Sequence, residues 1–189
     1  FISQGDYPLK GFHYLLQAMQ EILQNCPEAH IKVAGISVLG VNGIKSRIKI
    51  SAYGKYLRRL ILENRLEGKV RVLGNLSAEE MKREYLSAQI FVCPSAVENS
   101  PNSVAEGQLL GVPVAASRTG GIPDVVKDGV SGLLFEKGNV HELAACVSRI
   151  LTDKQLAKEL SASERETAAK LYNGENNYQK LIEIYQNIE

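Results

Sequence analysis

Short apolar runs alternate along the chain with longer stretches in which apolar residues recur every three or four positions. A short apolar run bounded by turn-forming residues is typical of a strand, whereas the longer recurrence is typical of an amphipathic helix. We interpret five runs as strands, the last of them weaker: "HIKVAG" at 30–35, "KVRVLG" at 69–74, "QIFVCP" at 89–94, "VPVAAS" at 112–117 and "SGLLF" at 131–135. The opening "FIS" belongs to one more apolar run, which we count as a first strand.

Two of the intervening stretches predict amphipathic helices. Residues 12–23 carry apolar side chains at helical spacing, and residues 77–88 open with Ser77 and Glu80 at the spacing of a capping box. In such a box, the serine hydroxyl and the glutamate carboxylate each accept a hydrogen bond from a backbone amide of the first turn. We therefore expect the second helix to begin at about Ser77.

The order of these elements predicts the fold class. Strands that alternate with helices form a mostly parallel sheet with helices on both faces. From about residue 139 the pattern is helical to the end, with a break at Gly174, whereas residues 36–50 fit neither period and predict a long loop. The sequence thus predicts an α/β fold with a doubly wound parallel sheet of about six strands and a helical C-terminal tail.

Composition narrows the possible functions. The 189 residues are 44% hydrophobic, which predicts one domain with a substantial core. A net charge of +1 gives no overall footprint for nucleic acid, so we expect no nucleic-acid partner. No apolar run approaches the roughly 20 residues that span a bilayer, and there is no signal-peptide pattern.

The cysteines and the opening residues add two expectations. Cys26, Cys93 and Cys146 are odd in number and form no CxxC pair, which favours a reducing, cytoplasmic compartment. The chain begins inside an apolar run without an initiator methionine, so we expect a fragment of a longer protein.

In a doubly wound sheet the ligand lies beyond the carboxyl ends of the strands, so the segments after the strands are the candidate sites. "GISVLGVNG" at 35–43 fits neither the dinucleotide fingerprint nor the P-loop pattern. "RTGGIPD" at 118–124 has paired glycines, which allow a close approach of backbone to a ligand but equally make an ordinary tight turn. The third candidate is "VENSPNSVAEG" at 97–107, and it carries the most chemistry.

The third segment predicts a helix start that attracts an anion. Ser100 and Pro101 look like an N-cap and a first helical residue, because proline has no amide hydrogen to lose there. The helix then begins at about Pro101, with free amides on Asn102 and Ser103 that point towards the strand ends. Such a helix start favours a phosphate.

Two glutamates flank this helix start. Glu106 falls in the second turn, on the same face as the predicted free amides, and Glu98 precedes the helix. A carboxylate beside a phosphate makes sense if it accepts hydrogen bonds from neutral hydroxyls, such as a ribose diol at Glu106 and sugar hydroxyls at Glu98. The spacing therefore suggests a nucleotide-sugar ligand; the alternative is two ordinary surface glutamates.

These residues resemble a known family. Glu98 and Glu106 match the E-x7-E signature of retaining glycosyltransferases of the GT-B fold, family 4 type. The run "AEGQLLGVPVAASRTGGIPDVVKDGVSGLLF" at 105–135 is similar to that family's text after the second glutamate. The resemblance covers nearly the whole chain and implies that residues 1–189 are a Rossmann-like C-terminal, nucleotide-sugar-binding domain. The N-terminal acceptor domain then lies outside the chain.

The resemblance also implies roles for single residues. Lys10 is similar to the family's diphosphate-binding lysine, whereas Gln4 stands where an arginine is usual and brings no charge. Pro101 falls on a glycine of the commoner form, which shifts the sugar contacts to Asn99 and Asn102. "GNLS" at 74–77 resembles the segment that reads the nucleobase. The implied catalytic residues are Lys10 and Glu98, and the implied donor-binding residues are Gln4, Lys10, Gly74, Asn75, Leu76, Glu98, Asn99, Asn102, Ser103 and Glu106.

The activity implied by the resemblance is transfer of a hexose from a UDP- or GDP-sugar to an acceptor hydroxyl with retention of configuration, as in polysaccharide biosynthesis. We expect no cofactor and no metal, because the chain lacks a D-x-D triplet and a His/Cys ligand cluster. The chain alone should not transfer sugar, since half of the cleft is absent. A nucleotide-sugar epimerase of similar fold and a non-catalytic nucleotide-sugar-binding domain are the alternatives.

The segment 45–71 is rich in lysine and arginine. We predict a helix there with Lys55, Arg58 and Arg65 on one face and Tyr53, Tyr56 and Leu60 on the other. That basic face is either simply solvated or docks against an anionic membrane or the missing domain. The second interpretation allows a cytoplasmic protein with peripheral contact at the inner face of the membrane.

Overall fold

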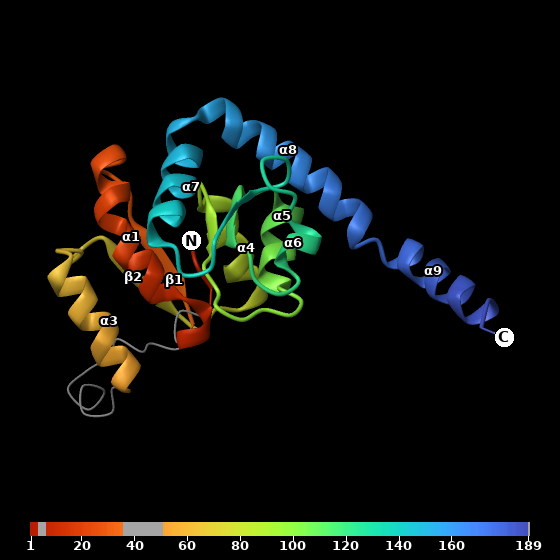
Figure 1. The fold of residues 1–189 in the computed structure, drawn as a ribbon, viewed down its shortest axis with the longest axis horizontal. Helices are drawn as coiled ribbons and strands as arrows, with labels where there is room; N and C mark the ends of the chain where they lie inside the picture. Colours follow the sequence, from red (N-terminus) through yellow and green to blue (C-terminus); the bar gives the residue numbers. More distant parts are fainter. Residues whose placement is uncertain (4–6, 36–50, 189) are drawn as a thin grey trace.

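The structure is a computed structural model that describes residues 1–3, 7–35 and 51–188. Its centre is a parallel sheet with helices on both sides (Figure 1). β1 pairs in parallel with β2, and β4 lies between β3 and β5, parallel to both. The strands are β1 (Ile31–Ala34), β2 (Val70–Gly74), β3 (Phe91–Cys93), β4 (Val114–Ser117) and β5 (Leu133–Phe135).

The first two residues connect the two groups of strands. On one side, the Ile2 amide donates to the Lys32 carbonyl at 3.0 Å and the Ile2 carbonyl accepts from Ala34, also at 3.0 Å. On the other side, the Phe1 carbonyl accepts from the Val92 amide at 2.9 Å. The order across the sheet is therefore β2, β1, residues 1–2, β3, β4, β5, which confirms the predicted doubly wound arrangement. The opening run contributes an isolated bridge rather than a full strand.

The predicted helices are present. Ser77 and Glu80 form the expected capping box at the start of α4. The C-terminal region is helical with a break at Tyr172 and Asn173, directly before the predicted Gly174, and it also breaks at Asp153. Residues 36–50, predicted as a loop, lie outside the described residues. The helices are η1 (Pro8–Lys10), α1 (Phe12–Asn25), α3 (Ala52–Glu63), α4 (Ala78–Ser87), α5 (Asn102–Leu110), α6 (Ile122–Val125), α7 (Val140–Thr152), α8 (Lys154–Leu171) and α9 (Gly174–Gln186).

Alternation along the strands divides the interior into two apolar clusters. Because successive strand residues point to opposite faces, Val92 of β3 packs with α1, α3 and α7, whereas Phe91 and Cys93 pack with α4 and α5. In the same way Leu134 of β5 lies in the second cluster, between two residues that lie in the first. Burial on both faces explains why β3, β4 and β5 are continuous apolar runs, whereas β1 and β2 each carry one basic residue, Lys32 and Arg71.

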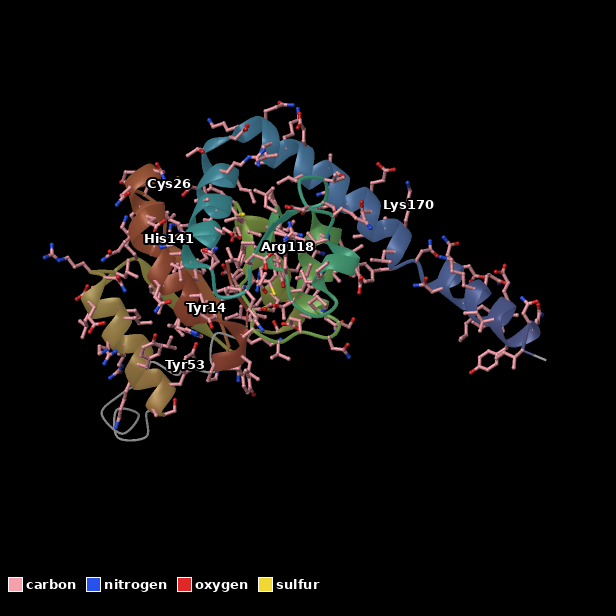
Figure 2. All side chains as sticks on the ribbon, in the orientation of Figure 1. Tyr14, Cys26, Tyr53, Arg118, His141 and Lys170 are labelled. Atoms are coloured by element: carbon pink, nitrogen blue, oxygen red, sulfur yellow. The ribbon has the colours of Figure 1, made fainter. Side chains whose placement is uncertain are left out.

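α3 differs in one respect from its prediction. It ends at Glu63, so Arg65 lies beyond the helix, with a positive φ of 53°, and shares no helical face with Lys55. The predicted face with Tyr53 and Tyr56 packs against α1 (Figure 2), where His13 Nδ1 lies 3.1 Å from the Tyr53 hydroxyl. The basic face of α3 is thus shorter than the sequence predicts, and residues 45–50 lie outside the described residues.

α8 and α9 form the C-terminal tail. α8 packs along α5, and the Arg165 guanidinium donates to the Leu110 carbonyl at 3.0 Å. α9 extends away from the rest of the molecule (Figure 1) and buries none of its residues. Its exposed apolar side chains, which we call the α9 stripe, are Tyr178, Leu181, Ile184 and Tyr185. Within the described ranges, no helix is long and apolar enough to cross a membrane.

Candidate functional site

A cavity of about 670 Å³ lies between α4 and α5, beside the carboxyl ends of β1 and β2. Parallel strands all present their carboxyl ends at one edge, so the segments that follow them meet there. The residues that line the cavity are Ser3, Ala34, Gly35, Asn75, Leu76, Ala78, Met81, Lys82, Tyr85, Asn102, Ser103, Glu106 and Leu110. Five of them, Asn75, Leu76, Asn102, Ser103 and Glu106, are residues that the sequence assigns to donor binding.

The other predicted site residues lie outside this lining. Gly74 ends β2 with a φ of 74°, and its carbonyl accepts from the Gly35 amide at 2.9 Å. Glu98 and Asn99 follow β3, and Lys10, the last residue of η1, contacts Glu98. Gln4 lies outside the described residues.

The start of α5 corrects the sequence prediction by one position. Pro101, not Ser100, is the N-cap residue, and the helix begins at Asn102. Pro101 has ψ of 86°, outside the helical range, and none of the described side chains caps this end. The Asn102 amide, predicted to be free, donates to the Ser100 carbonyl at 3.0 Å. Of the two predicted anion-binding amides, only that of Ser103 has no hydrogen bond within the described part of the chain.

Tyr85 supports the wall of the cavity from α4. Its hydroxyl donates to the Ser103 carbonyl at 2.8 Å, which fixes the first turn of α5 against α4. Burial, and then the nearby Glu106 carboxylate, raise the pKa of the Tyr85 phenol well above its usual range. Tyr85 therefore remains a neutral hydrogen-bond donor. Sequence reasoning missed this residue, which reads simply as an apolar position of the α4 pattern.

Lys10 and Glu98 are in direct contact. Lys10 Nζ lies 2.6 Å from Glu98 Oε1, and the Ser95 hydroxyl donates to the same oxygen at 2.8 Å. The Glu98 side chain is 7% exposed, whereas that of Lys10 is 28% exposed, so the carboxylate is the more buried partner. Ser95 is itself buried, and its carbonyl accepts from the Ser117 hydroxyl at 2.6 Å. The two residues predicted to be catalytic thus form an ion pair on a hydrogen-bonded support.

Glycines let the loops around this pair approach one another. A Cβ on Gly11 would lie 1.9 Å from the Pro94 carbonyl oxygen, and one on Gly120 would lie 1.6 Å from that of Glu98. A Cβ on Gly121 would lie 2.2 Å from the Asn99 carbonyl oxygen. The sequence left two possibilities for the paired glycines, an ordinary turn or an approach to a ligand. In the structure their close approach is to the backbone of the Glu98 loop.

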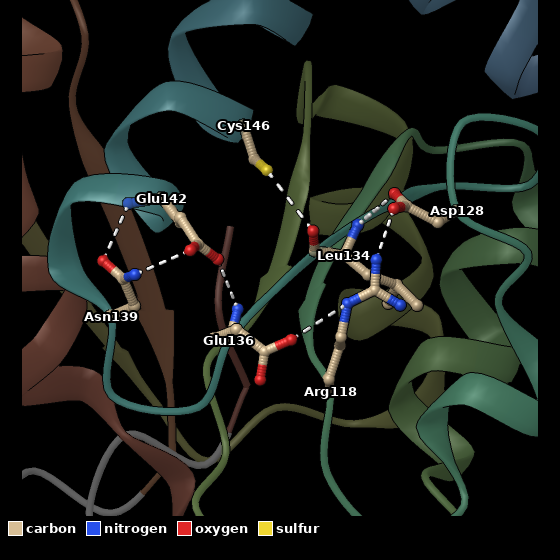
Figure 3. A network of polar contacts seen from close by, with 7 residues as sticks. All are labelled: Arg118, Asp128, Leu134, Glu136, Asn139, Glu142 and Cys146. Atoms are coloured by element: carbon tan, nitrogen blue, oxygen red, sulfur yellow. Dashed lines mark hydrogen bonds and ion pairs between the residues drawn. The ribbon is translucent and has the colours of Figure 1, made fainter.

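A polar network holds the segment after β4 (Figure 3). Arg118 forms ion pairs with Asp128 and, at 3.3 Å, with Glu136 Oε1. The second oxygen of Asp128 accepts from the Leu134 amide at 2.9 Å, and the Arg118 amide donates to the Phe135 carbonyl at 2.8 Å. The network therefore fixes the start of the glycine turn against β5. In the described parts of the chain, no three or more His, Cys, Asp or Glu side chains form a group that could hold a metal ion.

A doubly wound parallel sheet with a cavity of mixed polar and apolar lining beside its strand ends is typical of nucleotide-binding α/β proteins. The model of the family "Glycosyl transferases group 1" matches residues 2–167, and the chain belongs to this family. The fold is that of the GT-B glycosyltransferases. Two solved structures show the likeness. The Anabaena protein HepE in complex with UDP has a TM-score of 0.82 and 23% identity, over 100% of this chain and 49% of that one. The sucrose-phosphate synthase of Thermosynechococcus elongatus has a TM-score of 0.79 and 26% identity, over 98% of this chain and 44% of that one.

Curated relatives are similar over most of this chain. The D-inositol 3-phosphate glycosyltransferase of Corynebacterium urealyticum is 29% identical over 95% of this chain and 41% of its own length. The MMP alpha-(1->4)-mannosyltransferase of Mycolicibacterium hassiacum is 26% identical over 98% of this chain and 42% of its own length. The chain thus spans about two fifths of the length of these relatives.

Proposed function

We propose that this chain is the donor-binding part of a retaining glycosyltransferase that transfers a hexose from a UDP- or GDP-sugar to an acceptor hydroxyl. The observation that carries the proposal is the cavity between α4 and α5. It is lined by Asn75 and Leu76 on one side and by Ser103 and Glu106 on the other, and Asn102, four residues after Glu98, also lines it. Membership of a glycosyltransferase family and the likeness to a UDP complex support this choice.

The proposed ligand runs along the sheet edge. The nucleobase contacts the segment 74–76, and the ribose diol donates to the Glu106 carboxylate. The diphosphate accepts from the Ser103 amide, where the helix dipole of α5 favours negative charge, and from Lys10. The sugar then lies at the Glu98 loop, where Glu98, Asn99 and Asn102 offer acceptors and donors for its hydroxyls.

The proposed chemistry is electrostatic. Negative charge develops on the diphosphate as the bond from the anomeric carbon to its oxygen breaks, and Lys10 and the start of α5 stabilise that charge. In the structure Lys10 contacts Glu98 at 2.6 Å, so donor binding must exchange this contact for the phosphate. The exchange leaves Glu98 available to the sugar hydroxyls, while Ser95 continues to hold one of its oxygens.

The acceptor side is proposed to belong to the rest of the parent protein. The chain spans 41% of the length of a curated relative, so most of that relative has no counterpart here. The α9 stripe offers an apolar surface without a partner among the described residues, which supports contact with a further part of the parent protein. We therefore expect nucleotide binding, but not sugar transfer, from the 189-residue chain alone.

Calorimetric titration of the chain with UDP, GDP and their hexose conjugates tests the proposal. Glu106→Ala removes acceptors for two ribose hydroxyls and should weaken nucleotide binding by roughly 1 to 3 kcal/mol, about tenfold to a hundredfold. Lys10→Ala should weaken UDP or GDP far more than the free nucleoside. Glu98→Ala should weaken only the sugar-bearing donor. The matched control is Glu79→Ala, which removes an exposed α4 glutamate outside the cavity lining. Equal affinity of the Glu106 variant and the unaltered chain would overturn the assignment.

A further inference from the structure

Lys82 contributes a positive charge to the cavity wall opposite Glu106. Both residues line the cavity, Lys82 from α4 and Glu106 from α5. Two other charged residues of α4 already have partners: Glu80 accepts from the Ser77 amide at 2.8 Å, and Glu84 lies 2.8 Å from Lys32. Lys82 has no hydrogen bond or ion pair within the described residues. Its exposed ammonium group is therefore available to a ligand in the cavity.

The position of Lys82 along α4 determines which part of the ligand it reaches. α4 begins at Ala78, directly after the segment 74–76 that we assign to the nucleobase. Helical side chains lean towards the N-terminus of their helix, over the preceding turn. One turn advances about 5.4 Å, which a lysine side chain spans, so the Lys82 ammonium can reach the level of Ala78 and Leu76. Ala78 is too short to fill this place, and both residues line the same cavity.

We propose that Lys82 is a specificity-determining residue that donates a hydrogen bond to an exocyclic carbonyl oxygen of the nucleobase. An ammonium group has donors and no acceptor, so it favours the O4 of uracil and the O6 of guanine. At the same places cytosine and adenine carry amino groups, which are donors and are repelled. The inference rests on the proposed function and deepens it: the site takes nucleoside diphosphates with an oxo base and discriminates against those with an amino base.

Two pairs of nucleotides test this inference, since each pair contrasts an oxo with an amino group: UDP with CDP, and GDP with ADP. The 189-residue chain should prefer the oxo member of the pair that it binds by roughly tenfold, as expected for one hydrogen bond to a charged donor on an exposed side chain. Lys82→Met should bring that preference close to one by weakening the oxo nucleotide alone. Lys82→Arg, which keeps a charged donor, should retain most of the preference.

Arg83→Met is the matched control, because it removes one positive charge from the same helix outside the cavity lining. It should leave the preference unchanged. An equal loss for all four nucleotides in Lys82→Met would mean that the lysine acts only on the phosphates, and it would overturn the inference, as would an unchanged preference. Failure of the unaltered chain to bind any of the four would overturn the proposed function and this inference together, whereas tight UDP or GDP binding with an indifferent Lys82 variant would overturn the inference alone.

Discussion

Glu164 extends from α8 into the interior, where its side chain is fully buried. Its Oε1 accepts a hydrogen bond from the Val114 amide at 2.8 Å, and its Oε2 has no partner within the described residues. Burial raises the pKa of this carboxyl to about 8, and the Val114 hydrogen bond only partly opposes that shift. A neutral Glu164 therefore joins α8 to the first residue of β4.

The raised pKa makes stability depend on pH in a defined direction. Between the ordinary value of 4.5 and the folded value of about 8, the folded chain binds the Glu164 proton more tightly than the unfolded chain does. The contribution of the Glu164 proton to the free energy of unfolding is complete below pH 4.5. It declines as the pH rises through this interval and is lost above about pH 8. One pKa unit corresponds to about 1.4 kcal/mol, so the free energy of unfolding should fall by at most roughly 3 to 5 kcal/mol across this interval.

Glu164→Gln isolates this effect, because the amide keeps the shape and the acceptor for Val114 but does not titrate. Urea unfolding at pH 5, 6, 7, 8 and 9 gives the free energy of unfolding of both proteins. The unaltered chain should lose stability relative to the variant by several kcal/mol between about pH 5 and pH 8. Other carboxylates titrate in both proteins, so their effects cancel in the difference between the two free energies of unfolding. Two curves that stay parallel across this range would refute the reasoning.

Two further predictions concern backbone contacts and the α9 stripe. Gly120→Ala should cost well over the roughly 1 to 2 kcal/mol of a left-handed alanine, because the new Cβ would lie 1.6 Å from the Glu98 carbonyl oxygen. Gly129→Ala, with φ of 74° and no atom of the described residues within 4 Å of its Cβ, should cost only that strain. Equal losses of stability in denaturant unfolding would contradict the contact. Leu181→Ser should change the free energy of unfolding by no more than about 0.5 kcal/mol, because α9 buries none of its residues. Leu160→Ser in the core should cost several kcal/mol. A large loss for Leu181→Ser would mean that α9 packs on the domain.

The fold could be predicted because each of its signals is local and repeated. All five strands lie within the predicted runs. β3, β4 and β5 are buried on both faces and are therefore continuously apolar, while β1 and β2 are marked by short β-branched runs that a single lysine or arginine interrupts. The capping box at Ser77 located the start of α4 because two side chains and two amides satisfy one another there. The opening run was harder to assess, since its role as a bridge between β1 and β3 depends on partners distant in sequence.

The site was predicted less completely, because its details depend on contacts between loops. The Ser-Pro pair indicates a helix start, but the ψ of Pro101 moves the first helical residue to Asn102. Nothing local indicates that Gly120 approaches the Glu98 carbonyl, since either role of a paired glycine reads the same in sequence. Glu164 was detectable in principle: it is four residues from both Leu160 and Ala168, on the stripe that α8 buries.

The ion pair between Lys10 and Glu98 links two residues to which the sequence assigned separate roles: Lys10 to the diphosphate and Glu98 to the sugar hydroxyls. A carboxylate with only 7% of its side chain exposed is poorly hydrated, and an unpaired charge in that place would be costly. Lys10 compensates it before any ligand arrives, and the Ser95 hydroxyl holds the same oxygen. A diphosphate that attracts Lys10 would leave this carboxylate in need of new donors, which the hydroxyls of an attached sugar can supply. If the proposed site is correct, the sugar and the diphosphate should bind as one unit, because each satisfies a group that the other would leave unpaired.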